Sequence, residues 1–288
     1  MTTLKVGFVG AGFIANFQLE AIRQIRNMEV AGVTSRTRAH AEALAQKVRD
    51  GELGAGVVYE SISAMAPHVD ALALYAPNYL RVGMMEEIVA AVEAGAELKG
   101  VICEKPLGRN VQEARRLVEL AEAANLKTAY FENQLFMKAI TTQRAQLAPQ
   151  IETMGPPTLA RSAEEHGGPH EAWFWDPTRQ GGGVLSDMGC HSIAVGWYVL
   201  TPLGKPPSFL QPVAVNADVA LLKWGQPAWR QQLLDRFGVD YAKTPAEDFA
   251  TGLITYRNPE TGQLVKAQFT NSWMFEKQGL RLLMDGMG

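Results

Sequence analysis

The chain has 288 residues and a mass of 31.5 kDa, which is enough for one large domain or two of ordinary size. Its 27 Lys and Arg residues and 30 Asp and Glu residues leave a formal net charge of −3, which excludes the basic surface that nucleic acids and anionic membranes require. A hydrophobic content of 47% excludes wholesale disorder, and two cysteines exclude a disulfide framework. No apolar run approaches the roughly 18–20 residues that span a bilayer. We therefore expect a cytoplasmic globular protein without nucleic-acid or membrane partners.

The first half of the chain alternates between short apolar segments and longer helical ones. Such alternation is typical of βαβ units around a parallel sheet. The expected strands are 4–9, 29–34, 57–59, 71–75, 101–103 and 128–131, and the expected helices are 13–26, 37–50, 81–94 and 111–125. These elements predict an α/β fold with a nucleotide-binding domain over residues 1–133.

The second half has a different pattern, with longer strands in which apolar and polar residues alternate. Segments 251–256 and 264–272 are joined by a turn rich in Pro and Gly, which predicts a hairpin in a mainly antiparallel sheet. A long helix is expected over residues 183–200. We therefore predict a second α/β domain, residues 134–288, that binds the substrate.

A glycine motif, Gly10-Ala-Gly-Phe-Ile-Ala15, follows the first strand and opens a helix. Gly10 permits a tight turn, Gly12 lets the backbone approach a pyrophosphate, and Ala15 lets the helix pack close to the sheet. The phosphates would then lie on the free N–H groups at the helix N-terminus. The motif predicts dinucleotide binding in a Rossmann domain, although glycine turns also serve purely structural roles.

The end of the second strand carries hydroxyl and guanidinium groups in place of an acid. A site selective for NAD would have Asp or Glu there to bind the ribose 2′-OH, whereas this chain has Ser35, Arg36, Thr37 and Arg38. Arg can bind a 2′-phosphate through paired charge-assisted hydrogen bonds. The segment favours NADP(H) over NAD(H), and the alternative is a solvated helix start.

Two further motifs carry side chains suited to acid–base chemistry. Lys105 follows the strand 101–103 at the edge where a doubly wound sheet binds its ligand, so we expect it to donate a proton to a carbonyl beside the nicotinamide. In the run 181–191, Asp187 and His191 lie four residues apart and are expected to share a helix face, where they could hold a hydroxyl and move its proton. The alternative is a pair that only stabilises the helix. No third ligand has a helpful spacing, so no metal is expected.

Together these motifs resemble the Gfo/Idh/MocA family, the glucose-fructose oxidoreductase and myo-inositol dehydrogenase type of NAD(P)-dependent enzyme. The resemblance covers essentially the whole chain and includes the glycine loop, the segment Asp70–Asn78, the tetrapeptide Glu104-Lys-Pro-Leu107, Glu132-Asn-Gln134 and the helix that carries Asp187 and His191. It implies a Rossmann domain followed by an α/β domain whose open sheet presents one broad face for substrate closure and for a homodimer or homotetramer. It also implies a cis Lys105–Pro106 bond.

The resemblance assigns roles to individual residues. Lys105 and His191 become the catalytic pair, and Asp187 positions the substrate or tunes the proton transfer. Many relatives carry His where this chain has Arg81, at a position that borders the cofactor. The cofactor-binding residues expected are Gly10, Gly12, Phe13, Ile14, Ser35, Arg36, Thr37, Arg38, Ala76, Pro77, Asn78, Arg81, Glu104 and Lys105.

An aromatic stretch, residues 166–176, precedes the glycine run. Trp173 and Trp175 could stack on a sugar ring, or they could anchor a long loop onto the core. The substrate-binding residues expected are Lys105, Trp173, Trp175, Asp187 and His191.

The reaction expected is reversible hydride transfer between NADP(H) and a secondary alcohol or carbonyl of a sugar, polyol or sugar-like substrate. Two alternatives stay open: a non-catalytic dinucleotide-binding sensor with the same fold, and an NAD-dependent glycosidase. Residues 281–288 predict a strand running into a glycine turn, where longer relatives would continue. The second domain is therefore expected to be short at its C-terminus, as a natural variant or through truncation.

Overall fold

The computed structural model describes residues 3–277 and 279–287 and divides the chain into two units, Met1–Phe131 and Glu132–Gly288. The structure places the boundary between the units after Phe131, two residues before the boundary predicted after residue 133. Strand β6 ends at Phe131, and the short 3-10 helix Asn133–Phe136 that follows contacts helix α9 of the second unit. Glu132 and Asn133 therefore belong to the second unit.

The first unit is a six-stranded parallel sheet with the strand order β3-β2-β1-β4-β5-β6. This order is that of a doubly wound dinucleotide-binding sheet, which confirms the fold predicted for this half. Its strands are β1 (Leu4–Val9), β2 (Met28–Thr34), β3 (Val57–Val58), β4 (Ala71–Leu74), β5 (Gly100–Glu104) and β6 (Lys127–Phe131), and its helices are α1 (Phe13–Ile22), α2 (Arg38–Asp50), α3 (Ile62–Met65), α4 (Arg81–Glu93) and α5 (Val111–Ala123).

Two apolar clusters hold this sheet between its helices. Val6 and Phe8 of β1 pack with α1 and α2, whereas Val9 and Leu74 pack with α4 and α5. Neighbouring side chains of one strand point to opposite faces, so a strand with helices on both faces must be apolar throughout. This requirement explains why β4 reads Ala-Leu-Ala-Leu and is buried at every position.

The second unit is built on a five-stranded sheet with the order β11-β7-β10-β9-β8. Only the β7–β10 pairing is parallel, so the predicted mainly antiparallel sheet and the hairpin of β9 and β10 are confirmed. The strands are β7 (Leu159–Glu165), β8 (Gln211–Ala220), β9 (Phe249–Arg257), β10 (Leu264–Ser272) and β11 (Arg281–Met287), and the helices are α6 (Lys138–Leu147), α7 (Ile151–Met154), α8 (Pro177–Gln180), α9 (Cys190–Leu200) and α10 (Pro227–Phe237). Gly288, the end of the predicted last turn, lies outside the described residues.

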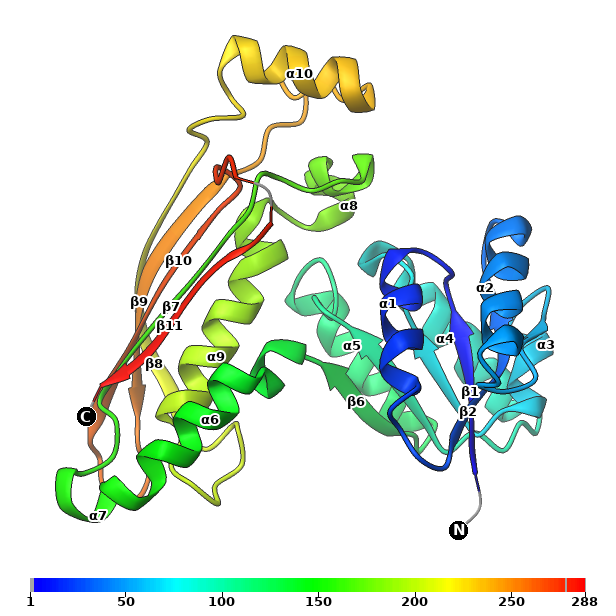
Figure 1. Cartoon of the computed structure of the whole chain (residues 1–288), viewed down its shortest axis with the longest axis horizontal. Coiled ribbons are helices and arrows are strands. Elements are labelled where there is room, and N and C mark those ends of the chain that lie inside the picture. The colour runs from blue at the N-terminus through cyan, green and yellow to red at the C-terminus, as the bar shows by residue number, and fades with distance from the viewer. Residues whose placement is uncertain (1–2, 278, 288) are drawn as a thin grey trace. The chain divides into compact units, whose positions relative to one another are not determined.

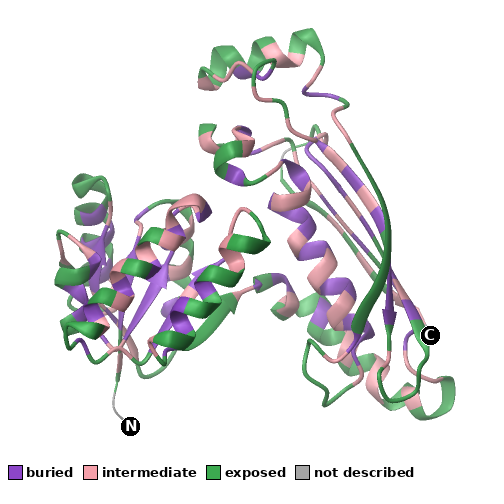
Figure 2. Ribbon diagram, turned by 180° about the vertical axis from the view of Figure 1, so that it is seen from behind, coloured by how far each residue is buried: buried purple, intermediate pink, exposed green. Residues whose placement is uncertain are grey.

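Helix α9 lies along one face of this sheet (Figure 1) and contacts β7, β10 and β11. Gly196 lets it approach closely, because a Cβ there would come within 3.0 Å of the Ala267 methyl group. Strand β8, at the sheet edge, is exposed along nearly its whole length (Figure 2). Among the described residues, none of the helices is long and apolar enough to cross a bilayer.

The predicted helix 183–200 is not a single α-helix. Residues Leu185–Gly189 form a turn of π-helix, and the α-helix begins at Cys190. A π-helical turn inside a helix often occurs at a functional site, because it changes where the following side chains point. Asp187 lies in this turn and His191 follows it.

Candidate active site

The glycine motif forms the turn that the sequence predicts. Gly10 follows β1 with a φ of 104°, and a Cβ there would lie 2.8 Å from the backbone nitrogen of Ala76. Gly12 is the N-cap of α1, where no side chain caps the helix. Apart from its chain neighbours, no described residue has an atom within 4 Å of the point that its Cβ would occupy. An uncapped helix start with open space beside it fits the pyrophosphate of a dinucleotide.

Four of the expected cofactor and catalytic segments follow the carboxyl ends of neighbouring strands. Gly10 follows β1, Ser35 follows β2, the segment 75–78 follows β4 and Lys105 follows β5. Because these strands are parallel, their carboxyl ends meet at one edge of the sheet, and the β1–β4 neighbourhood is the point where the strand order reverses. In this segment Asn78 is buried and Pro77 is half-buried.

The segment after β2 is exposed at three of its four positions. Ser35 is half-buried, whereas Arg36, Thr37 and Arg38 are exposed. Arg38 forms ion pairs with Glu42 and Glu60. Within the described part of the chain, no ion pair involves the guanidinium of Arg36, which remains available to an anionic ligand.

Arg81 supports the turn that carries Lys105. Its side chain is buried, with 3% exposed, and its Nη1 donates to the carbonyl oxygens of Glu104, Pro106 and Leu107. The Lys105–Pro106 peptide bond is cis, as the resemblance implied. Burial lowers the pKa of Arg81, an effect opposed by the nearby Cys103 and Glu104. The observed contacts of Arg81 are therefore with the backbone of this turn.

Glu104 lies beneath the same turn. Its carboxylate accepts from Gln18 Nε2 at 2.9 Å and from the Lys105 backbone N–H at 3.2 Å. Burial raises the pKa of Glu104, and the bonds from Gln18 and Lys105 oppose the rise. Lys105 itself is half-buried.

In the second unit, His191 pairs with a carboxylate that the sequence did not single out as catalytic. His191 Nδ1 lies 2.5 Å from Glu132 Oε1, and both side chains are about 95% buried. The backbone N–H of Gln134 donates to the same oxygen, which holds the carboxylate in place. A His whose Nδ1 is bound by a carboxylate keeps its Nε2 for the reacting group.

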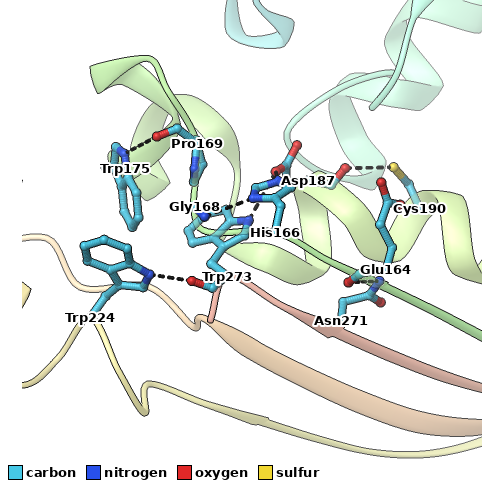
Figure 3. Close-up of polar contacts among 10 residues, drawn as sticks. All are labelled: Glu164, His166, Gly168, Pro169, Trp175, Asp187, Cys190, Trp224, Asn271 and Trp273. Atoms are coloured by element: carbon cyan, nitrogen blue, oxygen red, sulfur yellow. Dashed lines mark hydrogen bonds and ion pairs between the residues drawn. The ribbon is translucent and has the colours of Figure 1, made fainter. Parts of the chain in front are cut away.

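Asp187 belongs to a second polar network. Its Oδ2 accepts from Trp273 Nε1 at 3.2 Å and lies 3.6 Å from His166 Nε2 (Figure 3). His166 follows β7 and Trp273 follows β10, and because these strands are parallel neighbours their carboxyl ends bring both side chains to the same carboxylate. Asp187 and His191 thus contact partners on different elements.

The hydrogen bond to His166 Nδ1 defines the form of this ring. The Gly168 N–H donates to Nδ1 at 3.0 Å, so Nδ1 must be the unprotonated nitrogen (Figure 3). The ring proton of the neutral histidine then lies on Nε2, which faces Asp187. Two N–H groups, of Trp273 and His166, therefore point at one carboxylate.

Of the two tryptophans expected to bind substrate, Trp175 forms part of the core. It is 1% exposed, its Nε1 donates to the Pro169 carbonyl at 3.1 Å, and its ring contacts Trp224 and Trp273 with centroids 4.8 and 5.0 Å apart. A ring enclosed in this way has no face for a sugar, so the expectation for Trp175 is wrong and the anchoring alternative holds. Trp173 is half-buried and lies against Phe174.

Several site residues could not be found from the sequence. Glu247 accepts from the N–H groups of Gly183 and Leu185, and a Cβ on Gly183 would collide with the Glu247 carbonyl. Glu247, His166 and Trp273 are distant in the chain from Asp187, and no spacing links them. Glu132 is indicated in the sequence only as part of the Glu132-Asn-Gln134 motif of the family resemblance.

The fold also brings together three side chains of types that bind metal ions, a group that their spacing in the sequence does not reveal. Glu132 and Cys190 each offer one ligand atom within 4.8 Å of one on His191. The expectation of no metal rests only on ligands with a recognisable spacing from Asp187 and His191.

Sequence profiles of one family match both units. The profile described as an oxidoreductase family with an NAD-binding Rossmann fold matches residues 4–131, and the GFO/IDH/MocA C-terminal domain matches residues 143–286.

Curated relatives include D-glucoside 3-dehydrogenase of Escherichia coli (strain K12), 29% identical over 88% of this chain and 67% of its own length. An inositol 2-dehydrogenase of Cereibacter sphaeroides is 30% identical over 57% of this chain and 46% of its own length. The chain thus spans about half to two thirds of the length of the relatives it matches.

Solved structures show the same fold. A putative myo-inositol dehydrogenase from Sinorhizobium meliloti superposes with a TM-score of 0.74 at 19% identity, over 99% of this chain and 74% of that one. GenD2 from gentamicin A biosynthesis, solved in complex with NAD, superposes with a TM-score of 0.74 at 22% identity, over 100% of this chain and 70% of that one. With both units matched by its profiles, this chain belongs to the Gfo/Idh/MocA family of oxidoreductases.

Proposed function

We propose that this chain is an NADP(H)-dependent oxidoreductase that transfers hydride between the nicotinamide and a secondary alcohol or carbonyl of a sugar, polyol or sugar-like substrate. The observation that carries the proposal is the buried Glu132–His191 pair, a general base with its orienting carboxylate. The curated relatives, a glucoside dehydrogenase and an inositol dehydrogenase among them, support the substrate class.

When bound, the nicotinamide supplies the hydride chemistry, and the chain's residues manage the proton and the position of the substrate. His191 accepts the hydroxyl proton at Nε2 while Glu132 holds the ring through Nδ1. Lys105 is the second group proposed to take part in the transfer of this proton. Asp187, oriented by His166 and Trp273, accepts a hydrogen bond from a neighbouring hydroxyl.

We propose that the cofactor is bound by residues that follow the carboxyl ends of the strands in the parallel sheet. The N-terminal N–H groups of α1 bind the pyrophosphate, and Arg36 binds the 2′-phosphate that distinguishes NADP(H). The remaining contacts proposed are Gly10, Gly12, Phe13, Ile14, Ser35, Thr37, Arg38, Ala76, Pro77, Asn78, Arg81, Glu104 and Lys105.

We also propose self-association through the sheet face that α9 leaves uncovered. Leu253, Leu264 and Leu283 are 40–51% exposed on that face. Leu253 and Leu264 alternate with buried core residues, and Leu283 alternates with half-buried ones. Light scattering of the purified chain should show a dimer or tetramer, and a charged residue at Leu253 should shift it to monomer; a monomer at all concentrations would refute this.

The function is tested by following reduced nicotinamide while the protein is incubated with polyols, aldoses and keto-sugars and with either cofactor. Lys105→Ala should lower kcat by about 10²- to 10⁴-fold, the range for a general acid–base group, and leave cofactor binding intact. Lys127→Ala, which removes an exposed lysine of the same unit, is the control. Sugar cleavage without net reduction would indicate the glycosidase, and cofactor binding without turnover would indicate the sensor.

A further inference from the structure

A group of three metal-ligating side chains lies in the second unit. Glu132 Oε, Cys190 Sγ and His191 Nδ1 or Nε2 supply ligand atoms within 4.8 Å of one another. Glu132 and His191 are buried, whereas Cys190 is half-buried. Thiolate, imidazole and carboxylate together are typical of zinc sites, and three protein ligands leave a fourth position open.

An independent observation points to a ligand at this group. The second oxygen of Glu132, Oε2, is buried and has no hydrogen-bond partner among the described residues. A buried carboxylate oxygen without a donor costs free energy, which a bound cation would offset. The preceding π-helical turn, Leu185–Gly189, also places Cys190 and His191 at the irregular start of α9.

We propose that Glu132, Cys190 and His191 form a binding site for a thiophilic divalent cation of the zinc class. The charges balance, because one carboxylate and one thiolate neutralise the two positive charges of the ion. The thiol releases one proton to solvent on binding, and the proton of the neutral imidazole moves from Nδ1 to Nε2 when Nδ1 ligates the ion. Tetrahedral zinc sets ligand atoms about 3.3–3.8 Å apart, so shifts of about 1 Å from the 2.5 Å His191–Glu132 contact complete the site.

Occupancy has a consequence for catalysis that rests on the proposed function. An imidazole bound to the ion through Nδ1 carries its proton on Nε2 and cannot accept the hydroxyl proton there. Glu132 is at the same time withdrawn from His191. Zinc bound at this site therefore inhibits the oxidation of the alcohol.

The binding test uses Co²⁺ as a spectroscopic probe of the full chain, with Zn²⁺ as competitor. One equivalent of Co²⁺ should give a thiolate-to-cobalt charge-transfer band that Zn²⁺ abolishes. The band should be absent in Cys190→Ser, with Zn²⁺ affinity lowered by at least about a hundredfold, because even loss of an outer-shell partner costs 10- to 100-fold. Cys103→Ala is the matched control, since Cys103 is the other cysteine and burial raises the pKa of its thiol.

A second measurement uses the unaltered protein, in case Cys190→Ser does not fold. One equivalent of Zn²⁺ should protect the Cys190 thiol from alkylation, and chelation should restore its reactivity. No band in the unaltered protein, a band that persists in Cys190→Ser, or no protection of the thiol would each overturn the site.

Activity then tests the consequence separately. Zn²⁺ should inhibit the unaltered enzyme reversibly and leave Cys190→Ser active, and inhibition of both to the same extent would overturn the link to His191. Absence of turnover on any substrate would refute the proposed function while the cobalt spectrum still decides the metal site.

Discussion

The role of Glu132 gives the sharpest test of the catalytic arrangement. Glu132→Gln keeps the shape of the side chain and removes the charge that faces His191 Nδ1. The amide oxygen of the new residue can still accept from Nδ1, but it cannot stabilise the charged imidazolium that forms when Nε2 takes the substrate proton. We therefore expect kcat to fall while the binding of cofactor is unchanged.

The size of the effect follows from the contact. A hydrogen bond to a charged group is worth about 1.5–3 kcal/mol, and each 1.36 kcal/mol corresponds to a factor of ten in rate, so kcat should fall by about 10- to 150-fold. The atoms lie 2.5 Å apart and both side chains are about 95% buried, so little water screens the charge. These features place the expected loss in the upper part of that range.

The assay compares steady-state turnover and cofactor affinity in Glu132→Gln and in a control, Glu152→Gln, which makes the same change on an exposed helix of the second unit. Thermal unfolding of both variants confirms that each is folded. A larger solvent isotope effect in Glu132→Gln would show that the proton transfer has slowed. Turnover equal to that of the control would refute the proposed role of Glu132.

Three further predictions concern the first unit. Arg36→Ala should lower the affinity for NADP(H) by about 10- to 150-fold, the value of a lost charge-assisted hydrogen bond, and leave the affinity for NAD(H) unchanged. Fluorescence titrations measure both affinities, with the exposed Arg26→Ala as control. Equal losses of affinity for both cofactors would show that Arg36 does not contact a 2′-phosphate. In Arg81→Lys the shorter side chain cannot contact all three carbonyl oxygens of the turn that carries Lys105, so the free energy of unfolding in urea should fall by about 1–3 kcal/mol. An unchanged unfolding midpoint would argue that Arg81 does not stabilise this turn. Burial raises the pKa of Glu104 above its ordinary 4.5, so the folded state binds its proton more tightly than the unfolded state, and this contribution to stability is present below pH 4.5 and lost as the pH rises through the raised value. The free energy of unfolding of Glu104→Gln should therefore fall less than that of the unaltered protein as the pH rises through this range. Parallel pH profiles of the two proteins would contradict a raised pKa of Glu104.

The first unit could be predicted from the sequence almost element by element. Its strands β1, β2, β4 and β5 are largely buried and appear as apolar runs, while Gly10 and Gly12 meet steric demands that are local to one turn. Lys105 could be located because its place depends only on the end of β5. The sequence marks Arg81 as a departure from relatives but does not predict its burial beneath the turn, since the carbonyl groups that it contacts lie more than 20 residues further along the chain.

In the second unit the sequence predicted the hairpin of β9 and β10, and it put forward Asp187 and His191 as candidate catalytic side chains. It could not reveal their partners, because each partner comes from a distant segment. Trp175 shows the same limit, since its sequence neighbours suggested a stacking platform and its contacts with Trp224 and Trp273 place it in the core.

The sequence by itself determined the order of the elements, the Rossmann topology and the residue types able to move a proton, because periodicity, turn chemistry and short motifs are local properties. Only the tertiary structure decided what each reactive group contacts. The parallel pairing of β7 with β10 brings His166 and Trp273 to Asp187, and the end of β6 leads into Glu132 beside His191. Those contacts join residues 21 to 86 positions apart, and tertiary packing sets them.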